Sequence, residues 1–190
     1  MIPEKIKEHF ENKKYCQVIR STSTSSVEKT SGYIVDYSDS FVVLQETNDF
    51  DFVGFSLLPI NQLKEIRYNR TDKYFEKIFN WEGLKEKIGG RYKIDLISWA
   101  TVFKSLKKHS LIVIVECENL DVNTFNIGPI TKITRDSVYI QYFDATGLLD
   151  EKSTSIGFEN ITRVQFDARY INVFSKYLRH RKVKKLLTNK

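Results

Sequence analysis

Apolar and polar residues follow the same order in two long stretches of the chain. Residues 32–79 begin GYIVDYSDSFVVL, and residues 128–178 begin GPITKITRDSVYI. Each stretch opens on a glycine, continues through Asp-Ser into a β-rich run, and ends in a short apolar-spaced strand and an aromatic helix. Alternation of apolar and polar residues is typical of half-buried strands. The sequence therefore predicts a duplicated unit that is mainly β.

A helix is expected before each set of strands. Ile2, Ile6 and Phe10 recur every four residues, which predicts a first helix over residues 3–13. A second amphipathic helix is expected after Asp95, which can cap it. Its apolar face would hold Leu96, Trp99, Ala100, Phe103 and Leu106.

Five strands are expected in each copy. In the first copy they cover residues 15–20, 32–37, 40–45, 52–58 and 63–68. The Ser/Thr-rich residues 21–30 are expected to form a loop or a weak edge. In the second copy the strands cover residues 111–116, 128–133, 138–143, 153–158 and 161–166. A closing helix is expected from Thr71 or Asp72 to Gly89-Gly90, and another over residues 169–187.

The most specific pattern is Gly32-Tyr-Ile-Val-Asp-Tyr-Ser-Asp-Ser-Phe41-Val-Val-Leu, closed by Leu63-Lys-Glu-Ile66. Gly128-Pro-Ile130, Asp136-Ser-Val-Tyr-Ile140 and Ile161-Thr-Arg-Val164 match it more loosely. This order resembles that of the Sm-like family, the Sm, LSm and Hfq proteins, over roughly three-quarters of the chain. The resemblance implies a mainly β fold with α-helices: two tandem Sm-like (SH3-like) five-stranded barrels, each preceded by an N-terminal helix and joined by a helical connector.

Domain boundaries follow from this expectation. Residues 1–79 would form the first barrel with its helix, residues 80–94 the connector, residues 95–178 the second barrel with its helix, and residues 179–190 a basic tail. The repeated glycines have an architectural explanation, because sharply bent strands need glycine where they bend or approach closely.

In the Sm-like family, RNA is typically bound at two turns. Carried over, these turns hold Ser40 with Phe41, and Asn61 with Gln62; the second copy has Ser137 with Val138, and Glu159 with Asn160. Phe41 matches a position where an aromatic ring stacks on a base. The family's Lys-His pair is missing from both copies, and Glu159 would repel a phosphate, so the resemblance implies a weakened pocket in the first copy and a lost one in the second.

Charge gives a second candidate for RNA binding. The net charge is +6, yet residues 176–190 hold seven Lys and Arg residues and no acid, which leaves 23 basic against 24 acidic residues elsewhere. The tail cations expected to contact phosphates are Arg179, Arg181, Lys182, Lys184 and Lys185. A solubilising helix, an anionic membrane surface and an acidic protein groove remain alternatives for this tail.

Catalytic and metal-binding signals are absent from the sequence. His9, His109 and His180 have no ligand spacing, and no P-loop or nucleophile elbow occurs. Cys16 and Cys117 are expected to be buried, reduced thiols. We therefore expect no enzyme activity and no cofactor. The charged residues after Met1 do not predict a signal peptide, and residues 111–115, the longest aliphatic run, are too short to span a bilayer, so a soluble cytoplasmic protein is expected.

The sequence thus favours a non-catalytic nucleic-acid-associated protein that binds RNA through its basic tail, with Phe41 as a further candidate contact. The alternative is a protein-interaction or assembly module that has lost the RNA pocket and uses the edge strands of its barrels. A sensor of a small ligand between the two barrels is a third hypothesis.

Overall fold

The computed structural model describes residues 1–22, 27–119 and 121–180. The first half of the chain forms α1 (Ile2–Glu11), β1 (Tyr15–Ser21), β2 (Val27–Tyr37), β3 (Phe41–Asn48), β4 (Asp51–Pro59), η1 (Ile60–Gln62), β5 (Leu63–Arg67), α2 (Arg70–Trp81) and η2 (Lys85–Lys87). The second half forms α3 (Trp99–Lys108), β6 (Ile112–Glu118), β7 (Asn123–Ile133), β8 (Ser137–Ile140), β9 (Thr154–Gly157), η3 (Phe158–Asn160), β10 (Arg163–Phe166), α4 (Arg169–Phe174) and η4 (Ser175–Tyr177).

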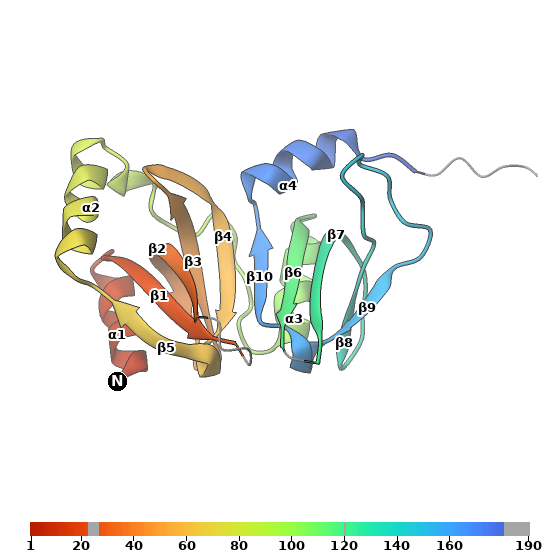
Figure 1. Cartoon of the computed structure of the whole chain (residues 1–190), viewed down its shortest axis with the longest axis horizontal. Helices are drawn as coiled ribbons and strands as arrows, with labels where there is room; N and C mark the ends of the chain where they lie inside the picture. Colours follow the sequence, from red (N-terminus) through yellow and green to blue (C-terminus); the bar gives the residue numbers. More distant parts are fainter. Residues whose placement is uncertain (23–26, 120, 181–190) are drawn as a thin grey trace, which may run out of the picture.

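All these strands pair antiparallel in one sheet with the order β5-β1-β2-β3-β4-β10-β6-β7-β8-β9 (Figure 1). The order within the first half, β5-β1-β2-β3-β4, recurs in the second half as β10-β6-β7-β8-β9. The sequence repeat is therefore also a repeat of strand order. The two halves meet where β4 pairs with β10.

The prediction of two five-stranded barrels is wrong. The strands form one continuous ten-stranded sheet that does not close, and β5 and β9 are its two outer strands. The last strand of the second half, β10, pairs with β4 on one side and β6 on the other. The backbone groups of β4 are thus satisfied across the two halves, and the Sm-like barrel expected from the resemblance is not what the chain forms.

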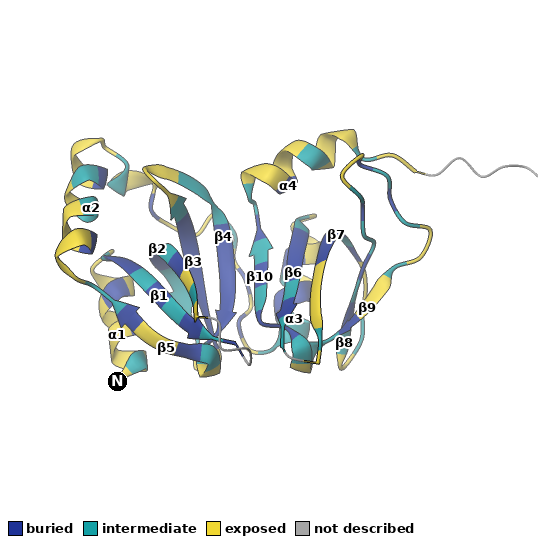
Figure 2. Ribbon diagram, in the orientation of Figure 1, coloured by how far each residue is buried: buried dark blue, intermediate teal, exposed yellow. Residues whose placement is uncertain are grey.

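Shared burial explains why the halves join. Phe55 on β4 stacks on Phe166 of β10 with ring centroids 5.3 Å apart. Both rings belong to the largest core cluster, which also contains Leu57 from the first half and Val115 and Val164 from the second. Fully burying one such side chain contributes about 1.5–3 kcal/mol, so a core shared between the halves favours one sheet over two separate units. Figure 2 shows the buried strands in the middle of the molecule and the exposed outer faces of the helices.

Several element boundaries differ from those predicted. Residues 27–30 belong to β2 because they pair with β1, although their sequence lacks apolar periodicity. Asn69 caps α2 by accepting from the N–H groups of Thr71 and Asp72, and the helix ends at Trp81 well before Gly89. Ser98, not Asp95, caps α3.

The final helix is much shorter than predicted. α4 ends at Phe174, and Arg179 lies in a β-bridge with Leu148. The rest of the predicted helix, residues 181–187, lies outside the described residues.

The close strand approach predicted at the repeated glycines is confirmed. A Cβ on Gly32 would lie 2.1 Å from the carbonyl oxygen of Gln45, and one on Gly128 would lie 1.9 Å from that of Gln141. Only glycine fits either position. Among the described residues, we find no helix with the length and apolar content needed to span a bilayer.

Candidate nucleic-acid interface

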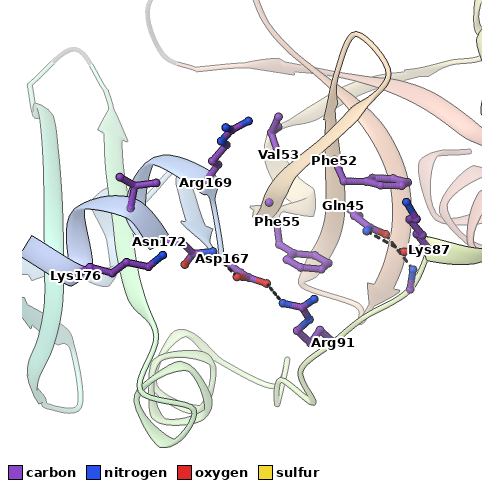
Figure 3. Close-up of a pocket in the computed structure, with 13 residues that line it drawn as sticks. Gln45, Phe52, Val53, Phe55, Lys87, Arg91, Asp167, Arg169, Asn172 and Lys176 are labelled. Atoms are coloured by element: carbon purple, nitrogen blue, oxygen red, sulfur yellow. Dashed lines mark hydrogen bonds and ion pairs between the residues drawn. The ribbon is translucent and has the colours of Figure 1, made fainter. Parts of the chain in front are cut away.

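A cleft of about 480 Å³ lies where the two halves meet (Figure 3). Its walls come from β3 and β4, from the segment that links the halves, and from α4 with the residues on either side of it. The lining residues are Gln45, Phe52, Val53, Gly54, Phe55, Lys87, Gly89, Arg91, Asp167, Arg169, Asn172, Val173 and Lys176. The cleft therefore exists only because the halves form one sheet.

The linking segment is held against the sheet by Gln45. The Nε2 atom of this buried side chain donates to the Lys87 carbonyl at 3.1 Å, and its Oε1 atom accepts from the N–H of Gly89 at 3.0 Å. These two bonds satisfy the buried amide and fix the backbone on both sides of residue 88. The side chain of Lys87 is left exposed at the cleft.

The opposite wall depends on Gly54 in β4. A Cβ at this position would lie 2.6 Å from Cα of Ala168, the N-cap residue of α4. The missing side chain lets the start of α4 approach the β4 backbone closely. Arg169 and Lys176 are thereby placed beside β4, although they belong to the other half of the chain.

Positive charge dominates the cleft. Lys87, Arg91, Arg169 and Lys176 line it and are all exposed, whereas Asp167 is the only carboxylate among the described residues of the lining. No acid within the part of the chain that the structure describes forms an ion pair with Lys87, Arg169 or Lys176. Exposed cations gathered in a cleft raise the local concentration of anions.

The single carboxylate is engaged from two sides. Asp167 accepts from Asn172 Nδ2 at 2.7 Å and lies 3.4 Å from Arg91 Nη1, as Figure 3 shows. Its backbone φ of 51° lies in the left-handed region, which Asp tolerates better than most residues. Asp167 therefore turns the chain from β10 into α4 and links α4 to the connecting segment.

Two arginine networks hold the halves together. Arg163 on β10 donates to Ser56 Oγ at 2.8 Å and pairs with Glu46 at 2.6 Å and with Glu116 at 3.3 Å. Burial alone would lower the pKa of Arg163, but Glu46 and Glu116 outweigh it and raise that pKa. Burial raises the pKa of Glu116, although Arg163 opposes the shift.

In the second network the arginine comes from the first half and its partners come from the second half. Arg20 on β1, only 1% exposed, lies 2.9 Å from Glu118 of the second half. It also donates to the Thr162 carbonyl at 3.1 Å, and the Thr162 hydroxyl donates to Glu118 at 2.6 Å. Each half thus contributes one arginine that pairs with a glutamate of the other half.

The four residues of the first copy that the Sm-like resemblance predicted to bind RNA lie together. Ser40 directly precedes β3, which begins at Phe41, while Asn61 and Gln62 lie in η1. The Ile60 N–H donates to the Ser40 carbonyl at 2.9 Å. Phe41 is 5% exposed, and its ring lies 4.7 Å from that of Trp99. Stacking a base on Phe41 would require its ring to leave this contact. Its RNA role stays a prediction.

The second copy adopts the same arrangement with a shift of one residue from the predicted equivalence: Ser137, not Val138, begins β8 as Phe41 begins β3. Val138 follows within β8, and Glu159 with Asn160 lies in η3. The Phe158 N–H donates to the Asp136 carbonyl at 2.9 Å, as Ile60 does to Ser40. Val138 is buried and cannot stack on a base.

Arg179 lies in the second half of the chain, in a β-bridge with Leu148. Its Nη2 atom donates to the Thr146 carbonyl at 2.8 Å, and its backbone bonds to Gly147 and Leu149. The other predicted tail contacts, Arg181, Lys182, Lys184 and Lys185, lie outside the described residues.

Sequence reasoning missed the cleft cations. Arg169 and Lys176 are seven residues apart, a spacing that places two side chains on one helix face, and this signal was available. Their proximity to Lys87 and Arg91 depends on the pairing of β4 with β10, which no local pattern reveals.

Metal and thiol chemistry find no support in the described geometry. Within residues 1–22, 27–119 and 121–180, no three His, Cys, Asp or Glu side chains gather as metal ligands would. Cys16 and Cys117 are buried free thiols, as predicted, and burial raises the pKa of both. A raised pKa disfavours the reactive thiolate.

The cleft therefore offers binding chemistry: exposed cations, amide groups and two phenylalanines, Phe52 and Phe55, at the junction of two similar halves. Comparison of the chain with protein-family models, with curated proteins and with solved structures finds no match.

Proposed function

We propose that this protein binds RNA without catalysing a reaction, and that the junction cleft holds the RNA backbone. The proposal rests on the excess of exposed cations over carboxylates in the cleft. Four exposed cations line the cleft; Asp167 pairs with one of them, Arg91, and Lys87, Arg169 and Lys176 have no ion-pair partner among the described residues. Apart from residues 176–190, the chain has nearly equal numbers of basic and acidic residues, so this concentration is local. Cations that neutralise phosphates release counterions, which favours binding.

The form of the cleft favours a polyanion over a small ligand. Small-molecule sites are lined mainly by apolar side chains and enclose most of the ligand. Here Lys87, Arg169 and Lys176 are exposed and open to solvent. A nucleic-acid backbone can lie across such a surface and contact several cations in turn.

The experiment is fluorescence anisotropy with a labelled single-stranded RNA of mixed sequence. The cleft variant carries Arg169→Gln and Lys176→Gln. The matched control carries Lys104→Gln and Lys108→Gln, which remove the same charge from exposed positions on α3. We expect the cleft variant to bind roughly tenfold more weakly or worse, and the control to bind nearly as the unmodified chain does. Equal affinities for the two variants would contradict the proposal.

The assembly alternative rests on the two outer strands. Among the described strands, β5 and β9 each have one partner, so their other sides offer backbone groups for pairing. They are short, at five and four residues, and expose Lys64, Glu65, Thr154 and Ser155. Short, polar edge strands protect a sheet against pairing with another chain. RNA binding is therefore better supported, and light scattering over a range of protein concentrations tests the alternative.

We include a cytoplasmic location in the proposal. Cys16 and Cys117 are free and buried, in keeping with a reducing compartment.

A further inference from the structure

Helix α2 carries an exposed face made only of cations, aromatic rings and uncharged polar groups. Tyr74 is 57% exposed and Trp81 is 67% exposed, and their ring centroids lie 6.2 Å apart. Arg70, Lys73 and Lys77 are exposed on the same helix. A shallow hollow of about 640 Å³ is lined by these cations together with Tyr74. A single exposed aromatic residue is ordinary, but two in contact among three cations form a surface of defined chemistry.

The two acids of α2 face inward. Asp72 is 2% exposed, and both of its carboxylate oxygens bond to Arg67. Glu76 accepts from the Tyr15 N–H at 3.1 Å and from the Tyr68 hydroxyl at 3.0 Å. Neither carboxylate neutralises the outward cations. The carboxylates within the helix are thus bonded to the protein, whereas Arg70, Lys73 and Lys77 are exposed, with Lys73 Nζ 5.4 Å from the centre of the Tyr68 ring.

The outward aromatic residues do not support the core. The apolar contacts of α2 come from its other side, where Phe79 is fully buried and packs against Tyr15 and Tyr33. Tyr74 and Trp81 contact each other instead. Burial does not explain why large rings occupy these two positions.

The buried side of α2 contacts a residue of the junction cleft. Phe52, which lines the cleft, packs against Phe79 of α2 with centroids 5.5 Å apart. Trp81 ends the helix, and the chain runs on through η2 to Lys87 at the cleft. Figure 1 shows the C-terminal end of α2 and the whole of α4 along the upper edge of the molecule, each in its own half.

We infer that Tyr74 and Trp81 form a stacking platform for unpaired bases and that Arg70, Lys73 and Lys77 bind the adjoining phosphates. This inference rests on the proposed function and narrows its substrate class to single-stranded RNA. Bases of a duplex are stacked on each other and cannot reach the two rings. Stacking on aromatic side chains tolerates any base sequence, so the platform would bind single strands without sequence preference.

The test compares single-stranded RNA with a duplex of equal length by anisotropy. The platform variant carries Tyr74→Ala and Trp81→Ala, and the control is Phe125→Ala, which removes a 51% exposed ring from β7. We expect the platform variant to lose roughly tenfold or more in affinity for the single strand, and to bind the duplex as the unmodified chain does. The control should leave both affinities unchanged. Circular dichroism melting confirms that each variant is folded.

Tryptophan fluorescence gives a second readout. A base stacked on Trp81 should quench its emission, and Trp81→Phe should remove that quenching while Trp99 still reports folding. Unchanged single-strand affinity in the platform variant, with binding lost in the Arg169→Gln, Lys176→Gln variant, overturns this inference and leaves the cleft proposal standing. An unmodified chain that binds neither RNA overturns both. Platform-dependent binding to vesicles of anionic lipid, with no preference for single-stranded RNA, identifies a membrane surface as the partner and also overturns it.

Discussion

Arg163 and Glu46 form an ion pair across the junction of the two halves, with Arg163 Nη2 2.6 Å from Glu46 Oε1. Arg163 lies on β10 and Glu46 on β3, and Ser56 of the intervening β4 bonds to both side chains. The pair therefore spans three adjacent strands and links the last strand of the second half to the first half. Since the cleft needs both halves in place, this pair supports the candidate site.

Removing Arg163 should destabilise the whole sheet. In Arg163→Leu, Glu46 and Glu116 keep their partly buried charges without a partner, and we expect the free energy of unfolding to fall by about 3–5 kcal/mol. Urea denaturation measures this change. The control is Arg135→Leu, because Arg135 is 94% exposed and its ion pair with Asp136 is a surface contact; its effect should stay below about 1 kcal/mol. Similar losses in both variants would contradict a supporting role for the junction network.

A side chain at residue 54 should disturb the cleft. Gly54→Ala places Cβ 2.6 Å from the Ala168 backbone, so β4 and the start of α4 must move apart. We expect a loss of about 1–3 kcal/mol in unfolding free energy, together with weaker RNA binding. Gly89→Ala is the matched control, because Gly89 also lines the cleft but a Cβ there meets nothing within 4 Å. A Gly54→Ala protein with unaltered stability would show that the close approach is dispensable.

Stability should fall as the pH decreases through the range below the ordinary pKa of histidine. Burial lowers the pKa of His9, although its contact with the Lys14 carbonyl and the charge of Glu8 oppose the shift. The folded protein therefore binds fewer protons at His9 than the unfolded chain does, and the stability present above about pH 6.5 is lost as the pH falls through the lowered pKa.

Urea denaturation between about pH 7 and about pH 5 checks this dependence. His9→Gln should flatten it, because glutamine does not titrate. His109→Gln should retain it, since His109 is exposed. If the His9 variant kept the full slope, other groups would account for the acid sensitivity.

Much of the secondary structure was predictable because it depends on local pattern. Alternating apolar residues located most strands, and Gly32 and Gly128 marked two close strand approaches. Residues 27–30 were missed because their strand conformation comes from pairing with β1. The continuous sheet was missed for the same reason: each copy has the same strands whether it closes on itself or pairs with its neighbour.

The candidate site depends even more on distant contacts. Arg91 and Asp167 are 76 residues apart in sequence, and no pattern in either segment indicates the other. The basic tail was conspicuous because its cations are adjacent in sequence. The cleft cations are dispersed along the chain, and only the β4–β10 pairing brings them together.

The predicted tail and Phe41 contacts can be separated from the cleft in the same assay. Replacing Arg181, Lys182, Lys184 and Lys185 with Gln should weaken RNA binding. In a protein that also carries the cleft substitutions, the two fold-losses in affinity should multiply, because the free energies of independent sites add. Phe41→Leu should mainly reduce stability, since its ring is 5% exposed. If Phe41→Leu abolished binding while the folded cleft variant bound normally, the RNA site would lie at β3 and η1.

The salt dependence of RNA binding tests the cleft most directly. Anisotropy titrations of single-stranded RNA at several salt concentrations give the slope of log K against log salt for the unmodified chain, for the Arg169→Gln, Lys176→Gln variant and for the Lys104→Gln, Lys108→Gln control. Each phosphate contact on a single strand contributes about 0.7 to this slope, so the cleft variant should be shallower by roughly 1.4 and the control unchanged. Identical slopes for all three proteins would contradict phosphate binding in the cleft.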